Sequence, residues 1–111
     1  MSNTYEAEFC ENFRKRLIKE CMGIVILAEL NKGRPRSGFD FIAFFNKKFN
    51  ILFSSGTVYS QLYSLERQGL IKGRLVSNAM VYLISEKGQK IMDTVTRLNL
   101  KIQECLEKFK Y

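Results

Sequence analysis

The sequence predicts a mainly α-helical domain with one small β-hairpin, in which three helices precede the hairpin and a long helix follows it. Apolar residues recur at helical spacing in four segments, and two β-prone runs are separated by a two-residue turn. The length of 111 residues suits one domain with extensions. We expect residues 1–84 to hold the three helices and the hairpin, and residues 85–111 to form a C-terminal helix of the same compact unit.

The first helical segment covers residues 5–30. Its apolar positions have helical spacing: Phe9, Phe13, Leu17, Cys21, Ile24 and Leu27. Gly23 interrupts the pattern weakly, and Asn31 and Gly33 are stop signals. We expect one long or broken helix whose second half is buried.

The second helix follows a loop that holds the only proline. Ser37 is a plausible N-cap because Asp40 lies three residues on, a variant of the capping box. The expected apolar stripe, running to about Lys48, consists of Phe39, Ile42 and either Phe45 or Phe49.

The third helix is expected to begin at a cap on Ser54 or Ser55 and to end before Gly69. Its buried stripe would be Val58, Leu62 and Leu65. The remaining positions are predicted to face outward: Thr57, Ser60, Gln61, Ser64, Arg67 and Gln68.

The hairpin is predicted to pair residues 70–76 with residues 79–84 around a tight turn at Ser77 and Asn78. Ser85 would then cap the last helix. An a/d heptad stripe runs along that helix: Ile91, Val95, Leu98, Ile102, Cys105 and Phe109. This helix outlasts the small body, so we expect Phe9 and Phe13 of a second copy to cover its far half in a two-fold homodimer. A purely intramolecular core face is the alternative.

Positive charge is concentrated in the middle of the chain. The net charge is +7, and residues 31–74 hold eight basic residues against Asp40 and Glu66, which leaves 8 − 2 = +6 there. Such a field suits a polyanion, most often nucleic acid, although an anionic membrane or a basic surface kept for solubility would look the same.

Three helices followed by a hairpin form the winged helix-turn-helix arrangement, in which the third helix enters the major groove. The expected outward face of that helix carries Gln and Arg, which pair with adenine and guanine edges, and short hydroxyl side chains for close approach. Any surface helix needs a polar face, but the neighbouring hairpin and the basic segment favour double-stranded DNA.

The sequence resembles the PadR family of transcriptional regulators in SGFDFI (37–42), SSGTVYSQLYSLERQGLI (54–71) and VYLISEKGQKIM (81–92). The resemblance implies a homodimeric winged-helix repressor or activator that dimerises through its C-terminal helix. By position, Thr57 and Tyr59 fall close to the DNA backbone, and Ser60, Gln61 and Ser64 fall on the groove side.

Two departures from the family pattern concern the DNA-binding residues. Ser55 stands where the family commonly has proline, a change that a helix N-terminus accepts. The wing RLVSNAMVY is short, and Arg74 is its only basic residue. Lys72 and Arg74, at the base of the wing, are therefore the expected DNA contacts. Ser55, Arg67, Gln68 and the basic Arg36 complete the expected DNA-binding set.

Other classes of function find little support. The chain has no histidine, glycine-rich phosphate loop, paired carboxylates or nucleophile motif, so we expect no enzyme. Its three cysteines form no Cys-x-x-Cys pair, and no metal or cofactor is expected. No small-molecule effector is indicated. The main apolar run, CMGIVILAEL, is too short for a membrane span, and we expect a soluble cytoplasmic protein.

Two rivals remain open at this stage. The same fold could serve as a protein assembly module whose basic charge is incidental. A small RNA-binding protein is the weaker rival, because no exposed aromatic platform for single-stranded RNA is evident.

Overall fold

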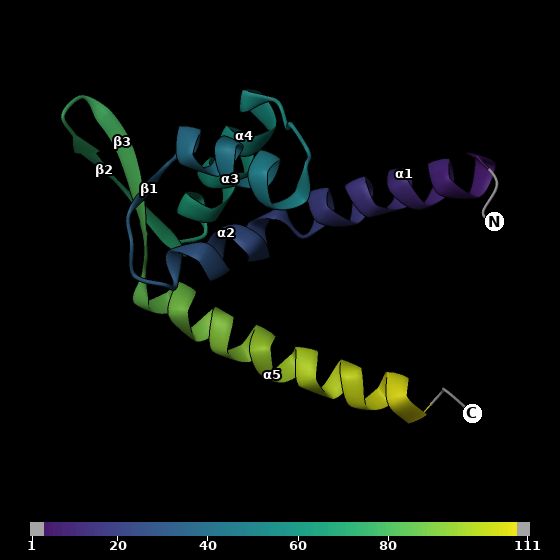
Figure 1. Cartoon of the computed structure of the whole chain (residues 1–111). Coiled ribbons are helices and arrows are strands. Elements are labelled where there is room, and N and C mark those ends of the chain that lie inside the picture. Colours follow the sequence, from purple (N-terminus) through teal and green to yellow (C-terminus); the bar gives the residue numbers. More distant parts are fainter. Residues whose placement is uncertain (1–3, 109–111) are drawn as a thin grey trace.

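Five helices and three short strands follow one another between residues 4 and 108, which a computed structural model describes, except for the side chains of residues 102, 105 and 106. The order is α1 (Thr4–Glu20), α2 (Met22–Leu30), β1 (Arg36–Ser37), α3 (Gly38–Phe49), α4 (Ser55–Arg67), β2 (Ile71–Val76), β3 (Ala79–Ile84) and α5 (Glu86–Lys108). In Figure 1 the helices α2, α3 and α4 form a small bundle with the sheet at one edge.

The core lies between α2, α3, α4 and the start of the sheet. Every helix of the bundle contributes fully buried residues, and the sheet adds two that are at most 2% exposed: Met22, Ile26, Phe41, Phe45, Val58, Leu62, Ile71 and Tyr82. Phe45 also meets Phe53 edge to face, with ring centroids 5.4 Å apart. This core fixes α4 against the other two helices.

One long helix or a broken one was expected over the first helical segment, and the helix is broken. The break lies at Cys21 and not at Gly23. Ser37 caps α3 as expected: its Oγ accepts from the Asp40 N–H at 3.1 Å, and the Asp40 carboxylate accepts from the Ser37 N–H at 2.9 Å. The stripe expected on α3 was partly wrong. Phe39 is 78% exposed, and Phe41 faces the core in its place, whereas Phe45 is buried as one of the two expected alternatives.

The hairpin has the expected register and turn. β2 pairs with β3 from Ile71↔Ile84 to Val76↔Ala79, and Ser77 and Asn78 both have positive φ angles, as a type I′ turn requires. The sequence did not predict β1, whose two residues pair with the other edge of β3 to give the order β1-β3-β2.

The two terminal helices project from the bundle as arms. In Figure 1 α1 and α5 leave the body in the same general direction and splay apart. No residue of α1 is buried, and α5 contributes Met92 near its start to the core. Among the helices between residues 4 and 108, none combines the length and the apolar character needed to cross a membrane.

Candidate nucleic-acid interface

Helix α4 is fastened at both ends. At its start the Ser54 Oγ accepts from the Thr57 N–H at 3.2 Å and lies 2.8 Å from the Thr57 hydroxyl. At its end Gly69 takes a positive φ, and two side chains from the start of α5 cap the free carbonyls. Lys87 donates to the Gln68 carbonyl at 2.9 Å and Ser85 to the Gly69 carbonyl at 2.6 Å. The helix is therefore held as a rigid element.

The outward face of α4 is a stripe of three exposed side chains. Val58, Leu62 and Leu65 are buried as expected, and the opposite side carries Ser60, Tyr63 and Arg67 at spacings of three and four residues. We call Ser60, Tyr63 and Arg67 the α4 stripe.

The expected exposure of Gln61 was wrong. The residue is half-buried, and its Oε1 lies 3.4 Å from where a Cβ on Gly23 would stand, so it faces α2. On a helical wheel position 61 is only about 60° from the centre of the buried stripe, which explains its inward turn.

The other residues of α4 expected to contact DNA differ in their exposure to solvent. Ser55 and Gln68 are exposed, whereas Thr57 and Ser64 are half-buried. The Ser64 Oγ accepts from the Gln68 side-chain amide at 3.1 Å, and Thr57 is engaged with Ser54. These hydroxyls therefore already have partners within the helix.

Tyr59 braces α4 on the start of α3. A Cβ placed on Gly38 would overlap the Tyr59 ring, so only glycine allows the ring to lie there. Tyr63, one turn later, has its ring centroid 6.1 Å from that of Tyr59 and is 51% exposed. Tyr63 was not among the residues expected on this face, although its spacing from Ser60 and Arg67 was the available signal.

A hydrogen bond joins the wing to α4. The Glu66 carboxylate accepts from the Gly73 N–H at 3.0 Å. A Cβ on Gly73 would crowd this carboxylate and the sulfur of Met80. Burial raises the pKa of the Tyr82 phenol above its usual value, and the Glu66 charge adds to the shift. Tyr82 and Glu66 thus join the wing and the helix.

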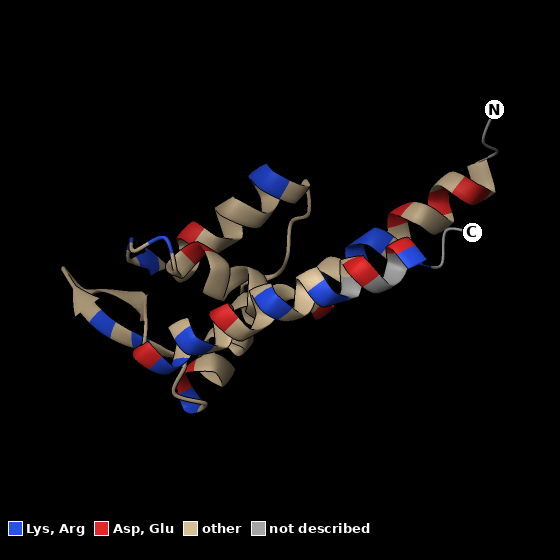
Figure 2. Cartoon of the chain, turned by 90° about the horizontal axis from the view of Figure 1, so that it is seen from below, with Lys and Arg blue, Asp and Glu red and all other residues tan. Residues whose placement is uncertain are grey.

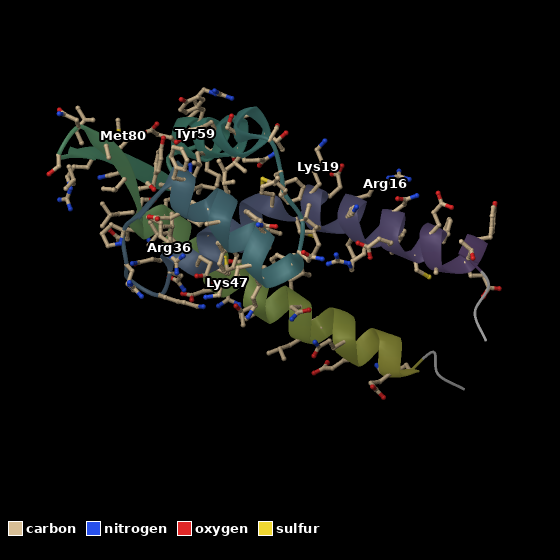
Figure 3. The ribbon with its side chains drawn as sticks, turned by 45° about the horizontal axis from the view of Figure 1, so that its top comes forward. Arg16, Lys19, Arg36, Lys47, Tyr59 and Met80 are labelled. Carbon is tan, nitrogen blue, oxygen red and sulfur yellow. The ribbon has the colours of Figure 1, made fainter. Side chains whose placement is uncertain are left out.

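Basic and apolar residues occupy different places on the wing. A Cβ on Gly73 would point toward Glu66, and side chains alternate along a strand, so Lys72 and Arg74 point to the opposite face of the sheet. Both are exposed. The tip carries exposed apolar side chains instead, Leu75, Val76 and Met80. Figure 3 places Met80 and Tyr59 at the same end of the molecule.

Loss of the Glu66 carboxylate should free the wing. In the Glu66→Ala variant the Gly73 amide loses its acceptor, and we expect its hydrogen exchange to accelerate and the free energy of unfolding to fall by about 1 kcal/mol. The Glu66→Gln variant keeps an acceptor oxygen and should retain most of the protection. Equal exchange rates in the wild type and the Ala variant would show that the bond does not hold the wing.

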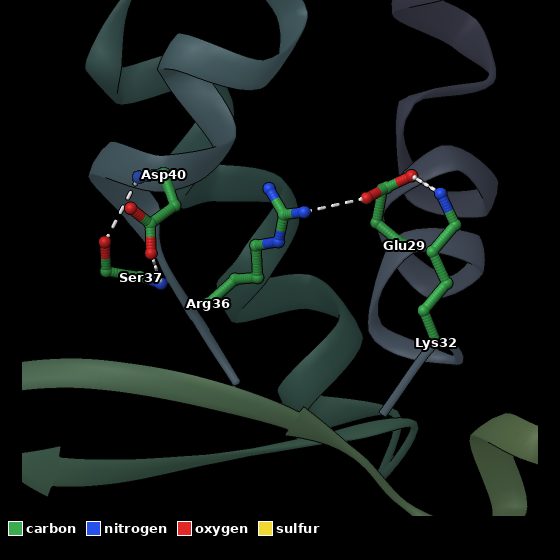
Figure 4. A network of polar contacts seen from close by, with 5 residues as sticks. All are labelled: Glu29, Lys32, Arg36, Ser37 and Asp40. Atoms are coloured by element: carbon green, nitrogen blue, oxygen red, sulfur yellow. Dashed lines mark hydrogen bonds and ion pairs between the residues drawn. The ribbon is translucent and has the colours of Figure 1, made fainter. Parts of the chain in front are cut away.

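Arg36 is engaged in an ion network rather than free for phosphate, contrary to the expectation. Its Nη2 lies 3.1 Å from Oε2 of Glu29, whose Oε1 accepts from Lys32 at 2.7 Å (Figure 4). Glu29 is only 7% exposed, and the Arg36 guanidinium lies over the Phe44 ring at 5.8 Å. A buried carboxylate left without these cations would be costly, so Arg36 serves the fold.

Basic residues are spread over several elements. Figure 2 shows Lys and Arg on the hairpin, in the loop before α3 and at the far end of α3, as well as along α5. The positive field is therefore broad, and the α4 stripe itself contributes one cation, Arg67.

The residues expected at a dimer interface lie along the two arms. Phe9, Phe13, Ile91 and Leu98 are exposed, and Val95 is half-buried. The rings of Phe9 and Phe13 stack with centroids 6.4 Å apart. The side chains of Ile102 and Cys105, and the whole of Phe109, lie outside the described residues. Each arm thus presents an apolar stripe that its own chain leaves uncovered.

Comparison with known proteins gives a consistent result. The model of the Transcriptional regulator PadR-like family matches residues 26–94. No curated protein is similar enough in sequence to count as a relative. A PadR family transcriptional regulator from Eggerthella lenta is 15% identical, with a TM-score of 0.76 over 96% of both chains.

Two further solved structures have the same fold. A transcriptional regulator from Clostridium thermocellum is 21% identical, with a TM-score of 0.72 over 86% of this chain and 96% of that one. A PadR-like transcriptional regulator from Bacillus cereus is 19% identical, with a TM-score of 0.71 over 84% and 94%. At these identities the likeness concerns the fold.

Proposed function

Because the chain belongs to the PadR-like family of transcriptional regulators, we propose that it is a repressor that binds a specific double-stranded DNA sequence as a homodimer. The observation that carries the proposal is the α4 stripe, Ser60, Tyr63 and Arg67, exposed on a helix that is fastened at both ends. A rigid helix with such a face can enter the major groove without first becoming ordered.

Each side chain of the α4 stripe has a distinct use in the major groove. The Arg67 guanidinium can donate two hydrogen bonds to O6 and N7 of one guanine. Ser60 is short enough for the backbone to approach the bases, and the Tyr63 ring can contact a thymine methyl group while its hydroxyl reaches a phosphate. Lys72 and Arg74 supply phosphate contacts from the wing.

The homodimer is supported by the uncovered apolar stripes of the arms. Phe9 and Phe13 on α1 and Ile91 and Leu98 on α5 are exposed within one chain, and a two-fold copy can bury both sets together. Two α4 helices related by that axis would read half-sites about one helical turn of DNA apart.

A protein assembly module is the second candidate. It is favoured by the exposed apolar residues at the wing tip, Leu75, Val76 and Met80, and by the exposed Phe39. Such a module would bind DNA with no preference for sequence or would not bind it at all.

Two single substitutions should separate sequence reading from phosphate binding. Arg67→Ala should weaken operator binding by about 1–3 kcal/mol and relax the preference at one base pair. Lys72→Ala should weaken binding to all sequences alike and lower the salt slope by about one. Affinities of both variants for the operator and its single-base variants, measured at several salt concentrations, test this. An unchanged preference in Arg67→Ala would remove that residue from base recognition.

The proposal is tested by a fluorescence-anisotropy titration against the DNA upstream of the protein's own gene and against a shuffled duplex of equal composition, each at two salt concentrations. We expect tighter binding to the upstream DNA that persists at the higher salt. No binding to either duplex would favour the assembly module instead.

A further inference from the structure

The outer side of α3 carries a groove that the proposed DNA interface does not use. It is an open hollow of about 550 Å³ lined by Arg36, Asp40, Ala43, Phe44, Lys47 and Lys48. The hollow exists because the side chain of Ala43 is short and the side chains around it are longer. Figure 3 shows Arg36 and Lys47 on the same side of the molecule and apart from Tyr59 and Met80. We call this hollow the α3 groove.

Some charged side chains around the α3 groove already have partners within the chain, and others do not. Arg36 is paired with Glu29, and the Asp40 carboxylate accepts from the Ser37 backbone in the capping box. Lys47 and Lys48 are exposed and form no ion pair within residues 4–108. Their place in the last turn of α3 suits the helix dipole, but the dipole explains neither the hollow nor its apolar floor. One end of the groove therefore carries two unneutralised positive charges.

The floor of the groove is held in place before any partner arrives. The Arg36 guanidinium lies 5.8 Å from the centre of the Phe44 ring, and Glu29 fixes that guanidinium from behind. Phe44 also meets Phe45 and Phe49 edge to face, with centroids 5.5 and 6.1 Å apart. A preformed apolar floor beside two cations costs little to occupy.

We propose that the α3 groove is a docking site for a short acidic segment of another protein. Carboxylates of that segment would lie against Lys47 and Lys48, and one apolar side chain would fill the space over Ala43 and Phe44. From Asp40 to Lys48 the helix rises about 12 Å, the length of three or four residues of extended peptide. A DNA backbone suits this groove less well than a peptide with an apolar side chain, because a phosphate backbone has nothing to place on the apolar floor. Docking there would leave the α4 stripe free.

The test uses the full chain and two short fluorescent peptides. One peptide is rich in Glu and Asp with a single Leu, and the other has each acid replaced by its amide. We expect the acidic peptide to bind at least about tenfold more tightly than the amide peptide, as loss of paired charges implies. Two substitutions at exposed positions of the groove, Ala43→Glu and Lys48→Glu, should each weaken binding of the acidic peptide by about tenfold.

The control variant is Lys101→Glu, which makes the same charge change on the exposed side of α5. It should leave peptide binding unchanged, and thermal unfolding should show that every variant is folded, with only Lys48→Glu slightly less stable because an acid at a helix C-terminus opposes the dipole. Affinity for the DNA that the protein binds best should change less than twofold in Ala43→Glu. Equal binding of the two peptides, an equal effect of Lys101→Glu, or parallel loss of DNA and peptide binding would overturn the proposal. Because peptide binding is measured without DNA, its failure is distinguishable from a failure of the proposed DNA function.

Discussion

A glutamate in place of Leu98 should convert the proposed homodimer into a monomer and lower the affinity for a two-half-site operator by at least about 100-fold. Leu98 is 54% exposed in the single chain, so the substitution removes little packing from the fold. In the dimer the same side chain would be covered by the partner's arms, and burial of an unpaired carboxylate costs several kcal/mol. Loss of the dimer also removes the avidity that links two half-sites.

The matched control is Leu100→Glu on the same helix. Leu100 is 56% exposed and lies about 200° around the helix from Leu98, away from the a/d stripe. Sedimentation at micromolar concentration should give a monomeric mass for Leu98→Glu and a dimeric mass for Leu100→Glu. A wild-type protein that sediments as a monomer, or two variants that behave alike, would contradict the arm-mediated dimer.

The largest effect on folding is expected from a single methyl group on Gly88. A Cβ at this position would overlap the backbone carbonyl oxygen of Leu70 and lie 2.7 Å from Cγ1 of Ile84. A backbone oxygen cannot move aside as a side chain can, so α5 would have to shift from the sheet. We expect Gly88→Ala to lower the free energy of unfolding by about 2–3 kcal/mol, even though alanine favours helix.

The same substitution at Gly56 is the control. No heavy atom lies within 4 Å of a Cβ built on that residue, which is in the first turn of α4. Gly56→Ala should therefore be neutral or stabilising by up to about 1 kcal/mol. Urea unfolding of the two variants gives both values. A Gly88→Ala variant as stable as the wild type would mean that the junction of α5 with the sheet is looser than the structure indicates.

The elements that local signals determine were predictable from the sequence. Ser37 with Asp40, Ser54 before α4 and Gly69 after it are short-range signals whose hydrogen bonds form within one turn. The hairpin was equally accessible because its strands are separated by two residues that both take positive φ.

The parts of the fold that the sequence did not predict depend on contacts between elements. Helix α3 has aromatic residues at so many positions that two stripes fit its period, and only the packing against α2 and α4 selects Phe41 over Phe39. The two-residue strand β1 exists only because the edge of β3 is nearby. Its length gives no periodic signal in the sequence.

In the candidate site, too, local signals were predictable from the sequence and contacts between elements were not. Ser60 and Arg67 are exposed, as expected, because they lie opposite the buried stripe. Arg36 could not be recognised as a structural residue, since its partner Glu29 lies seven positions away on another element. The expected exposure of Gln61 was wrong for a different reason. A polar side chain near the edge of a buried stripe can turn toward a neighbouring helix, here toward Gly23 of α2.

Methylation interference would show whether two copies of α4 read DNA in the major groove. Dimethyl sulfate modifies guanine N7 in the major groove and adenine N3 in the minor groove. We expect methylated guanines to block binding in two clusters about one helical turn apart, and Arg67→Ala to remove the effect at one guanine in each cluster. Binding that tolerates every methylated guanine, or that is blocked only at adenine N3, would contradict this expectation.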